Sequence, residues 1–257
     1  MAVDIARPTG ASQPLVSVIL PVRDPSEVLL RRCLSSFAAL STVLRMELVV
    51  VRTGVLDPRW LDEARGFCCV RIVECQVPGI YAAFNTGIAA AAGRFLLFYG
   101  HDDIALPDMD AAMQLLESTD PERTLVACGV HVQGLGNRWP SRLRQGIVFR
   151  NWGHQGLFYP ASLIEPDAYD AAYPLRADHR LNMKLLSRKN IACLRPPLVV
   201  SYFSRGGYST QNIADSRFDT EQARLAACDF GWVWGVAVRV LLPVVRATRR
   251  AFRVLVP

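Results

Sequence analysis

A pair of adjacent aspartates is the first feature of this sequence that could do chemistry. Asp102 and Asp103 follow directly after the apolar run at residues 95–99, which predicts a buried strand. Adjacent carboxylates repel each other unless a cation or hydrogen-bond donors compensate their charge, and Mg²⁺ often shares such oxygen ligands with substrate phosphates. The same pair could instead cap the next helix, whose start is marked by Pro107. The residues alone leave both interpretations open.

The elements that must position this pair alternate between strands and helices. The patterns predict strands at residues 15–20, 47–51, 70–73, 95–99, 125–130, 156–159 and 198–203, and helices at 27–40, 80–92 (ending before Gly93) and 178–188. Such alternation predicts an α/β fold with a mostly parallel sheet and helices on both faces. Ligands of these sheets bind beyond the carboxyl ends of the strands, which is where the aspartate pair lies.

The length suits one large α/β domain or two small ones, and because no linker divides the chain we expect one domain with a C-terminal appendage. The chain has 257 residues, 51% hydrophobic and 20% charged, which excludes a disordered protein, a small disulfide scaffold and a coiled coil. Its seven cysteines lack the regular spacing of a metal site or a disulfide framework, so reduced thiols are predicted. Residues 1–14 contain no apolar segment typical of a secretory signal, and we expect a flexible leader and a cytoplasmic protein.

The positive charge of the chain gathers near its C-terminus. The formal net charge is +6, and five arginines lie between residues 239 and 253, after the last acidic residue, Asp229. The rest of the chain is almost neutral and shows no platform of aromatic and basic residues. Nucleic acid is therefore not expected as a partner.

These arginines share one face of a predicted C-terminal basic amphipathic helix. Arg239, Arg246, Arg250 and Arg253 fall on the same side, opposite an apolar side, and Pro243 offers a place for a bend. Two tryptophans precede the basic residues. The pattern suits an anionic membrane at the inner face of the plasma membrane. The alternative is that the apolar side packs on the protein body or on a second subunit.

The order of several motifs resembles family 2 glycosyltransferases, which have the GT-A fold with its Rossmann-like sheet. The resemblance is carried by residues 16–21, 47–51, 79–88, 92–93, 98–103, 154–155, 177–182 and 206–209. The resemblance covers roughly residues 14–212, and within the family the chain looks most similar to the enzymes of capsule, colanic-acid and O-antigen synthesis. The resemblance implies a nucleotide-binding half at 15–103 and an acceptor half at 104–212. Residues 213–257, beyond the resemblance, are predicted to form a C-terminal helical appendage.

The resemblance also implies roles for the three aspartates. Asp103 would coordinate a divalent cation, Mn²⁺ or Mg²⁺, across the donor diphosphate, and Asp102 would contact the ribose or the metal. Asp178 would be the base that takes the proton of the acceptor hydroxyl. Without the resemblance, Asp178 is equally interpreted as an acid at a helix N-terminus, where the helix dipole favours negative charge.

The remaining site residues fall into two implied groups. The donor-binding group consists of Pro21, Arg23, Arg52, Gly79, Tyr81, Asn85 and Asp102. The acceptor or loop group consists of His154, Gln155, Gly206 and Gly207. Tyr81 and Asn85 lie four residues apart, so one side of a helix presents both, either to the nucleotide or as a surface polar pair. His154 and the two glycines are also compatible with an ordinary structural histidine and an ordinary turn.

The sequence departs from the family pattern on the donor side. Arg52 stands where the family usually has an aspartate that binds the donor base, although Asp57 is retained. Thr86 replaces a lysine, and residues 22–24 replace the usual Thr-Tyr-Asn. Because arginine only donates hydrogen bonds, the donor could be UDP-linked or linked to another nucleoside diphosphate.

The sequence as a whole predicts an inverting, metal-dependent glycosyltransferase. It would move a sugar from a nucleotide-sugar to a hydroxyl of a glycan or lipid-linked glycan during cell-surface polysaccharide synthesis. The main alternative is a non-catalytic GT-A-like subunit that binds a partner enzyme or the membrane. A nucleotidyltransferase fits less well, because residues 22–25 do not form the glycine-rich loop of that class.

Overall fold

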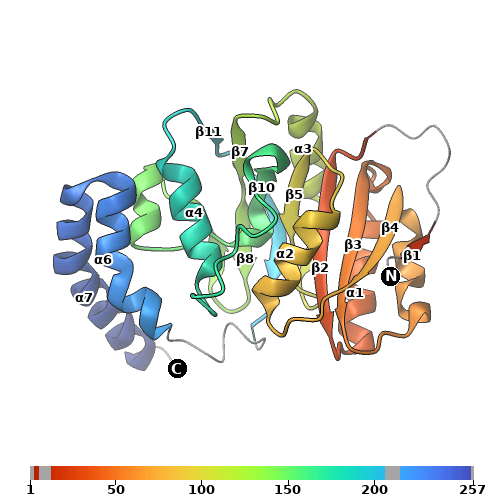
Figure 1. Ribbon diagram of the computed structural model, residues 1–257, viewed down its shortest axis with the longest axis horizontal. Helices are drawn as coiled ribbons and strands as arrows, with labels where there is room; N and C mark the ends of the chain where they lie inside the picture. Colours follow the sequence, from red (N-terminus) through yellow and green to blue (C-terminus); the bar gives the residue numbers. More distant parts are fainter. Residues whose placement is uncertain (1–2, 6–12, 206–214, 256–257) are drawn as a thin grey trace.

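The computed structural model describes residues 3–5, 13–205 and 215–255, and at 3–5 and 245–255 it describes the backbone only. Eight strands form the main sheet in the order β1-β4-β3-β2-β5-β10-β7-β11 (Figure 1). Their bounds are β1 Val3–Ile5, β2 Val16–Arg23, β3 Met46–Thr53, β4 Cys69–Glu74, β5 Phe95–Phe98, β7 Thr124–Ala127, β10 Leu157–Pro160 and β11 Ala192–Leu194. A smaller sheet has the order β6-β12-β8-β9, with bounds Ile104–Ala105, Val199–Phe203, Gly129–Val132 and Gly136–Arg138.

Helices connect these strands and cover the main sheet. The α-helices are α1 Glu27–Ala38, α2 Ile80–Ala90, α3 Asp108–Glu117, α4 Ala177–Ser187, α6 Ser216–Phe230 and α7 Trp232–Leu255. Short 3-10 segments are η1 Val43–Arg45, η2 Pro58–Gly66, η3 Arg144–Val148, η4 His154–Gly156 and η5 Ala161–Leu163. The expected α/β architecture with helices on both faces is confirmed.

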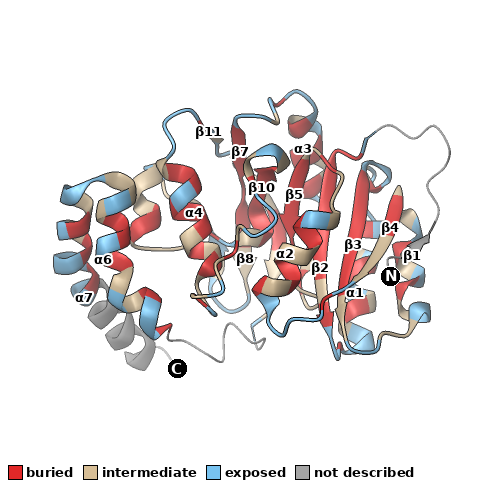
Figure 2. Ribbon diagram, in the orientation of Figure 1, coloured by how far each residue is buried: buried red, intermediate tan, exposed pale blue. Residues whose placement is uncertain are grey.

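Alternating side chains of β3 show why both faces of the sheet are covered. Leu48 and Val50 belong to a buried cluster with α1 and α3, whereas Val49 and Val51 belong to a second cluster with α2 and α4. All four are fully buried, so the strand is a continuous apolar run rather than an alternation of apolar and polar residues. Figure 2 shows the central strands as buried along their length.

Four parallel strands set the edge at which the site forms. β4, β3, β2 and β5 are parallel neighbours, so their carboxyl ends meet at the same edge of the sheet. β10 then pairs antiparallel with both β5 and β7, which brings the start of β10 to that edge as well. The segment before β10, η4, therefore lies beside the end of β5.

Three details of the fold differ from the sequence predictions. Residues 3–5 of the expected leader form β1, which pairs antiparallel with β4. The expected strand at 125–130 is two strands in different sheets. The break falls between Cys128, whose N–H donates to the carbonyl of Gly156, and Gly129, whose N–H donates to the carbonyl of Leu198, both at 2.8 Å. One apolar run thus serves two sheets, and periodicity alone does not reveal the break.

The end of α2 is the third difference. The helix stops at Ala90, and Gly93 is not its cap. A Cβ on Gly93 would lie 2.5 Å from the backbone nitrogen of Ser17. The glycine is therefore explained by the close approach of the α2–β5 turn to β2.

The C-terminal helices α6 and α7 form a hairpin at the end of the molecule remote from β1 (Figure 1). Gly231 makes the turn between them with φ +96°, a conformation that favours glycine. On the body side, Phe218 of α6 packs on the ring of His179, and Gln222 donates to the carbonyl of Val148 at 2.7 Å. Pro243 lies inside α7. Within the described residues, none of the helices is long and apolar enough to cross a membrane.

Candidate active site

The two adjacent aspartates lie in a tight turn directly after β5. The backbone N–H of Gly100 donates to Oδ2 of Asp103 at 2.9 Å, and the N–H of Asp103 donates to the carbonyl of Gly100 at 3.2 Å. A Cβ on Gly100 would lie 2.7 Å from Oδ1 of Asp102 and 3.1 Å from Oδ2 of Asp103. Both carboxylates therefore approach the same side of Gly100, and a side chain at this position would have to displace them.

Asp103 combines deep burial with an unused acceptor. Its side chain is 1% exposed, and Oδ2 accepts a second hydrogen bond from Nε2 of Gln155 at 3.0 Å. Oδ1 has no hydrogen-bond partner among the described residues. Burial, followed by the negative charge of Asp102, raises the pKa of Asp103 to about 7. The surroundings of Asp103 therefore stabilise its negative charge poorly, because the described residues around it offer no donor to Oδ1 and place a second negative charge nearby.

Asp178, in the first turn of α4, has the opposite environment. Oδ1 accepts from the hydroxyl of Tyr81 at 3.0 Å, and Oδ2 accepts from Nδ2 of Asn151 at 2.6 Å. Nδ1 of His154 lies 3.5 Å from Oδ2. Burial, the largest single effect, raises the pKa of Asp178, but the hydrogen bonds and charges around it, those of His154 first, together outweigh burial and hold the pKa below the usual value. Asp178 is thus buried and ionised at neutral pH, as a base must be.

One 3-10 turn connects the two acidic sites. His154 and Gln155 are consecutive residues of η4, and their side chains contact Asp178 and Asp103 respectively. The charge of His154 also lowers the pKa of Asp103, so this histidine lies near both acids. The structure thereby brings Asp102, Asp103, Asp178, Tyr81, His154 and Gln155, all singled out in the sequence, to one place.

Three polar residues behind Asp178 were not found from the sequence. Nδ2 of Asn182 donates to Oδ1 of Asn151 at 2.9 Å, and the hydroxyl of Tyr159 donates to Oδ1 of Asn182 at 2.7 Å. The chain of hydrogen bonds therefore runs from the buried Tyr159 to Asp178. Asn182 lies within the motif at 177–182 but was not singled out as a site residue, and Asn151 and Tyr159 carry no distinctive spacing in the sequence.

Arg32 is a further residue missed at the sequence level. From α1, its Nη2 donates to the carbonyl oxygen of Asp102 at 3.1 Å and lies 3.3 Å from Oγ of Ser204. The Ser204 hydroxyl donates to the same carbonyl at 2.7 Å. These contacts fix the backbone of the aspartate pair from the side of β12. Gly206 and Gly207, predicted as a loop over the site, lie outside the described residues.

The predicted donor-side residues Pro21, Arg23, Arg52 and Gly79 lie at or just beyond the carboxyl ends of β2, β3 and β4. Arg52 pairs with Glu74, its neighbour in register on β4, at 2.9 Å, and donates to the carbonyl of Gly54 at 2.9 Å. Arg23 is largely exposed. Gly79 precedes α2 with φ +121°, a backbone conformation that L side chains rarely adopt. Their contact with a donor stays a prediction.

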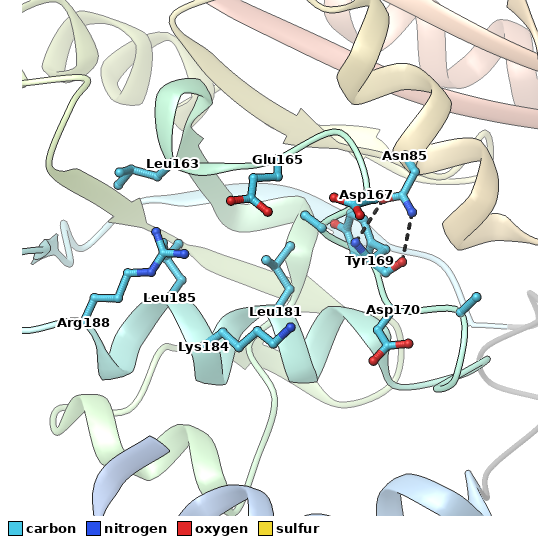
Figure 3. Close-up of a pocket in the computed structure, with 12 residues that line it drawn as sticks. Asn85, Leu163, Glu165, Asp167, Tyr169, Asp170, Leu181, Lys184, Leu185 and Arg188 are labelled. Carbon is cyan, nitrogen blue, oxygen red and sulfur yellow. Dashed lines mark hydrogen bonds between the residues drawn. The ribbon is translucent and has the colours of Figure 1, made fainter. Parts of the chain in front are cut away.

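Asn85 lies one turn further along α2 than Tyr81 and is engaged differently. Its Nδ2 donates to the carbonyl of Tyr169 at 2.9 Å, and its Oδ1 accepts from the N–H of Tyr169 at 3.0 Å. Asn85 and Tyr169 line a cavity of about 510 Å³ between α2, α4 and the segment at 163–171, shown in Figure 3. Neither Asp103 nor Asp178 lines this cavity. Asn85 holds that segment on α2, and its predicted role in donor binding stays a prediction.

Comparisons with known proteins place this site in a fold and a family. TarS of Staphylococcus aureus in complex with UDP superposes with a TM-score of 0.60 at 18% identity, over 83% of this chain and 64% of that one. The mannosyltransferase PcManGT from Pyrobaculum calidifontis, in complex with GDP-Man and Mn²⁺, gives 0.55 at 15% identity, over 95% and 81%. These likenesses confirm the expected GT-A fold.

The sequence comparisons are more specific. The model described as Glycosyl transferase family 2 matches residues 17–177, and the chain belongs to this family. A PGL/p-HBAD biosynthesis glycosyltransferase of Mycobacterium tuberculosis is 29% identical over 214 residues, which cover 80% of this chain and 82% of the relative. The chain is a glycosyltransferase, as the sequence motifs predicted.

Proposed function

We propose that this protein is an inverting, cation-dependent glycosyltransferase that uses a nucleotide-sugar donor and a hydroxyl acceptor. The observation that carries the proposal is the η4 turn, whose consecutive residues His154 and Gln155 hold two acids in different electrostatic states. Asp178 is kept ionised, whereas Asp103 is buried with an unpartnered oxygen. A base must be ionised to accept a proton, and a cation ligand must offer a carboxylate oxygen that no other group occupies.

The residues around Gly100 fit a divalent cation such as Mn²⁺ or Mg²⁺. Oδ1 of Asp103 is a buried acceptor without a partner among the described residues, and Oδ1 of Asp102 and Oδ2 of Asp103 both lie close to the position that a Cβ on Gly100 would occupy. The described residues contain no group of three or more His, Cys, Asp or Glu side chains arranged for a metal. Mg²⁺ sites built from one or two carboxylates are commonly completed by substrate phosphates and water. A bound cation would stabilise the charge that develops on the departing diphosphate.

The transfer step follows from the position of Asp178. One of its oxygens accepts the proton of the acceptor hydroxyl while the hydroxyl oxygen forms a bond to the anomeric carbon. The bond between that carbon and the diphosphate oxygen breaks, and the nucleoside diphosphate leaves with the electron pair. Because attack and departure occur on opposite faces in a single displacement, the anomeric configuration inverts. Tyr81 and Asn151 hold the carboxylate for this step.

The donor is proposed to be UDP-linked or linked to another nucleoside diphosphate. The fold is shared with a UDP complex and with a GDP-Man and Mn²⁺ complex, which supports the class of donor but not the base. Arg52 is paired with Glu74, so a carboxylate of β4 lies beside the position where the family usually has an aspartate. The acceptor is proposed to be a glycan or a lipid-linked glycan in cell-surface polysaccharide or glycolipid synthesis; the mycobacterial relative is a glycosyltransferase named for PGL/p-HBAD biosynthesis.

The proposal also includes the location of the protein in the cell. We propose a cytoplasmic protein, peripheral at the inner face of the plasma membrane, with no nucleic acid as partner. The basic C-terminal segment supports the membrane contact, and the near-neutral body argues against nucleic acid.

Thermal unfolding with UDP, GDP, CDP and dTDP, each with and without Mn²⁺, tests the proposal. A ligand at about 100 times its dissociation constant stabilises the folded state by roughly 2.7 kcal/mol. We expect a cation-dependent shift with one nucleotide, which Asp103→Asn abolishes and the exposed control Asp62→Asn preserves. A folded protein that responds to none of the nucleotides would instead be the non-catalytic GT-A-like subunit.

A further inference from the structure

Helix α7 presents an apolar stripe that nothing in the described structure covers. Val233, Val236, Val240 and Val244 follow one another at spacings of three, four and four residues, so they share one side of the helix. Their exposed fractions lie between 53% and 61%. Trp232 and Leu241, which flank the four valines, are also exposed. We call the four valines and these two flanking residues together the α7 stripe.

The opposite side of α7 is already used for packing. Val238 and Leu242 are buried, and Gly235 lies so close to α6 that a Cβ there would be 2.6 Å from the Cβ of Ala227. Trp234 meets the ring of Phe149 at 6.4 Å between centroids. The α7 stripe therefore lies on the side of α7 that does not pack on α6 or the body. The helix itself lies at the end of the molecule remote from β1 (Figure 2).

The charge of α7 distinguishes between two partners that could cover the α7 stripe, a second copy of this chain and a lipid bilayer. Arg239 is exposed on the same helix, four further arginines follow in the sequence, and no acidic residue follows Asp229. A second copy seated on the stripe by twofold symmetry would bring two such basic segments together without any acid of either segment to pair them. An anionic bilayer supplies both an apolar layer and negative charge.

We infer that the α7 stripe inserts into the surface of an anionic lipid bilayer, with the arginines of the same segment on the lipid headgroups. This inference gives a surface to the membrane contact proposed above. It does not depend on the transfer reaction, because the stripe contains none of the residues around Asp103 or Asp178. An exposed tryptophan at the start of the stripe suits the boundary between headgroups and acyl chains.

Co-sedimentation of the full chain with vesicles tests the inference. The vesicles are phosphatidylcholine alone or phosphatidylcholine with about one third phosphatidylglycerol, a fraction chosen to give the strong surface charge on which such binding depends. The variant is Val236→Asp/Val240→Asp, and the matched control is Leu44→Asp, another exposed apolar residue far from α7. We expect wild type and the control to bind the anionic vesicles only, and the double variant to lose at least about tenfold in its bound-to-free ratio.

Two results would overturn the inference. Equal vesicle binding by wild type and the double variant would show that the stripe is not the inserted surface. A wild-type dimer in solution that the double variant dissociates, with no vesicle binding by either, would assign the stripe to a second copy. A cooperative melting transition near the wild-type temperature shows that the double variant is folded, and the nucleotide-dependent shift, measured on the same samples, separates this test from that of the proposed donor site.

Discussion

His154 and Gln155, neighbours in η4, hold two different aspartates: Nδ1 of His154 lies 3.5 Å from Asp178, and Nε2 of Gln155 donates to Asp103 at 3.0 Å. One short turn therefore fixes the spacing between the proposed base and the proposed cation ligand. Because η4 leads directly into β10, which pairs with β5, the turn cannot shift without disturbing the sheet that carries Asp102 and Asp103. Rigid placement of this kind is what a transfer reaction requires of its reacting groups.

Removing the charge of Asp178 is expected to stop transfer while leaving donor binding intact. In Asp178→Asn the amide cannot take the acceptor proton, so kcat should fall by roughly 10²–10⁴-fold. The melting shift caused by nucleotide and Mn²⁺ should persist, since the variant leaves Asp102 and Asp103 unchanged. The two measurements are product formation from a nucleotide-sugar and thermal unfolding. Transfer at close to the wild-type rate would show that another group is the base.

Asn151 is expected to act on the reaction through Asp178. Asn151→Ala removes the 2.6 Å hydrogen bond to Oδ2, so the pKa of Asp178 should rise. The acidic limb of the kcat profile should then move to higher pH, with a smaller loss of kcat on the alkaline side. The exposed Asn190→Ala is the matched control. An unshifted limb, with only a lower melting temperature, would reduce Asn151 to a structural role.

The stability of the fold is expected to fall in acid through His179. This ring is buried against Phe218, its Nε2 donates to the carbonyl of Ile147 at 2.5 Å, and burial lowers its pKa to about 4. Between pH 6.5 and 4 the unfolded chain binds a proton that the folded chain excludes. The free energy of unfolding therefore decreases as pH falls through this window, by on the order of 3 kcal/mol from this group.

The test compares wild type with His179→Gln by denaturant unfolding at several pH values. The variant should lose less stability than wild type below pH 6.5, so the difference between them should shrink in acid. A difference that stays constant from pH 7 to 4 would mean that His179 does not titrate in this range.

Glu47 is expected to be a stability residue and not part of the site. It is fully buried at the opposite edge of the sheet, where its Oε1 accepts from Oγ of Ser17 and from the N–H groups of Ala92 and Gly93. Glu47→Ala removes the acceptor of the Ser17 hydroxyl and the Ala92 N–H, whereas the Gly93 N–H keeps its bond to Oγ of Ser17, and the change should lower the free energy of unfolding by roughly 2–4 kcal/mol. The exposed Glu63→Ala should change it by less than about 0.5 kcal/mol. Urea unfolding measures both, and equal values would contradict this role.

Several site residues were predictable because their signal is local. Asp102 and Asp103 follow a buried strand, and a parallel sheet sends every such residue to the same edge. Tyr81, His154, Gln155 and Asp178 belong to short motifs that resemble one family, and the structure brings them together with the aspartate pair. Arg52 was visible as a departure from the pattern, but its partner Glu74 became visible only when β3 and β4 were aligned in register.

The sequence by itself determined the α/β class, the placement of the acidic pair and membership of the glycosyltransferase family. Hydrophobic periodicity and motif order depend only on neighbouring residues, so they are readable without a fold. The tertiary structure alone decided that residues 124–132 serve two sheets, that Asn151 and Asn182 stand behind Asp178, and that Arg32 reaches Asp102. The bonded pairs Asn151–Asp178, Asn151–Asn182 and Arg32–Asp102 are 27, 31 and 70 residues apart along the chain. Which of many similar polar side chains meet over such distances is set by the packing of whole helices and strands, and no local pattern records it.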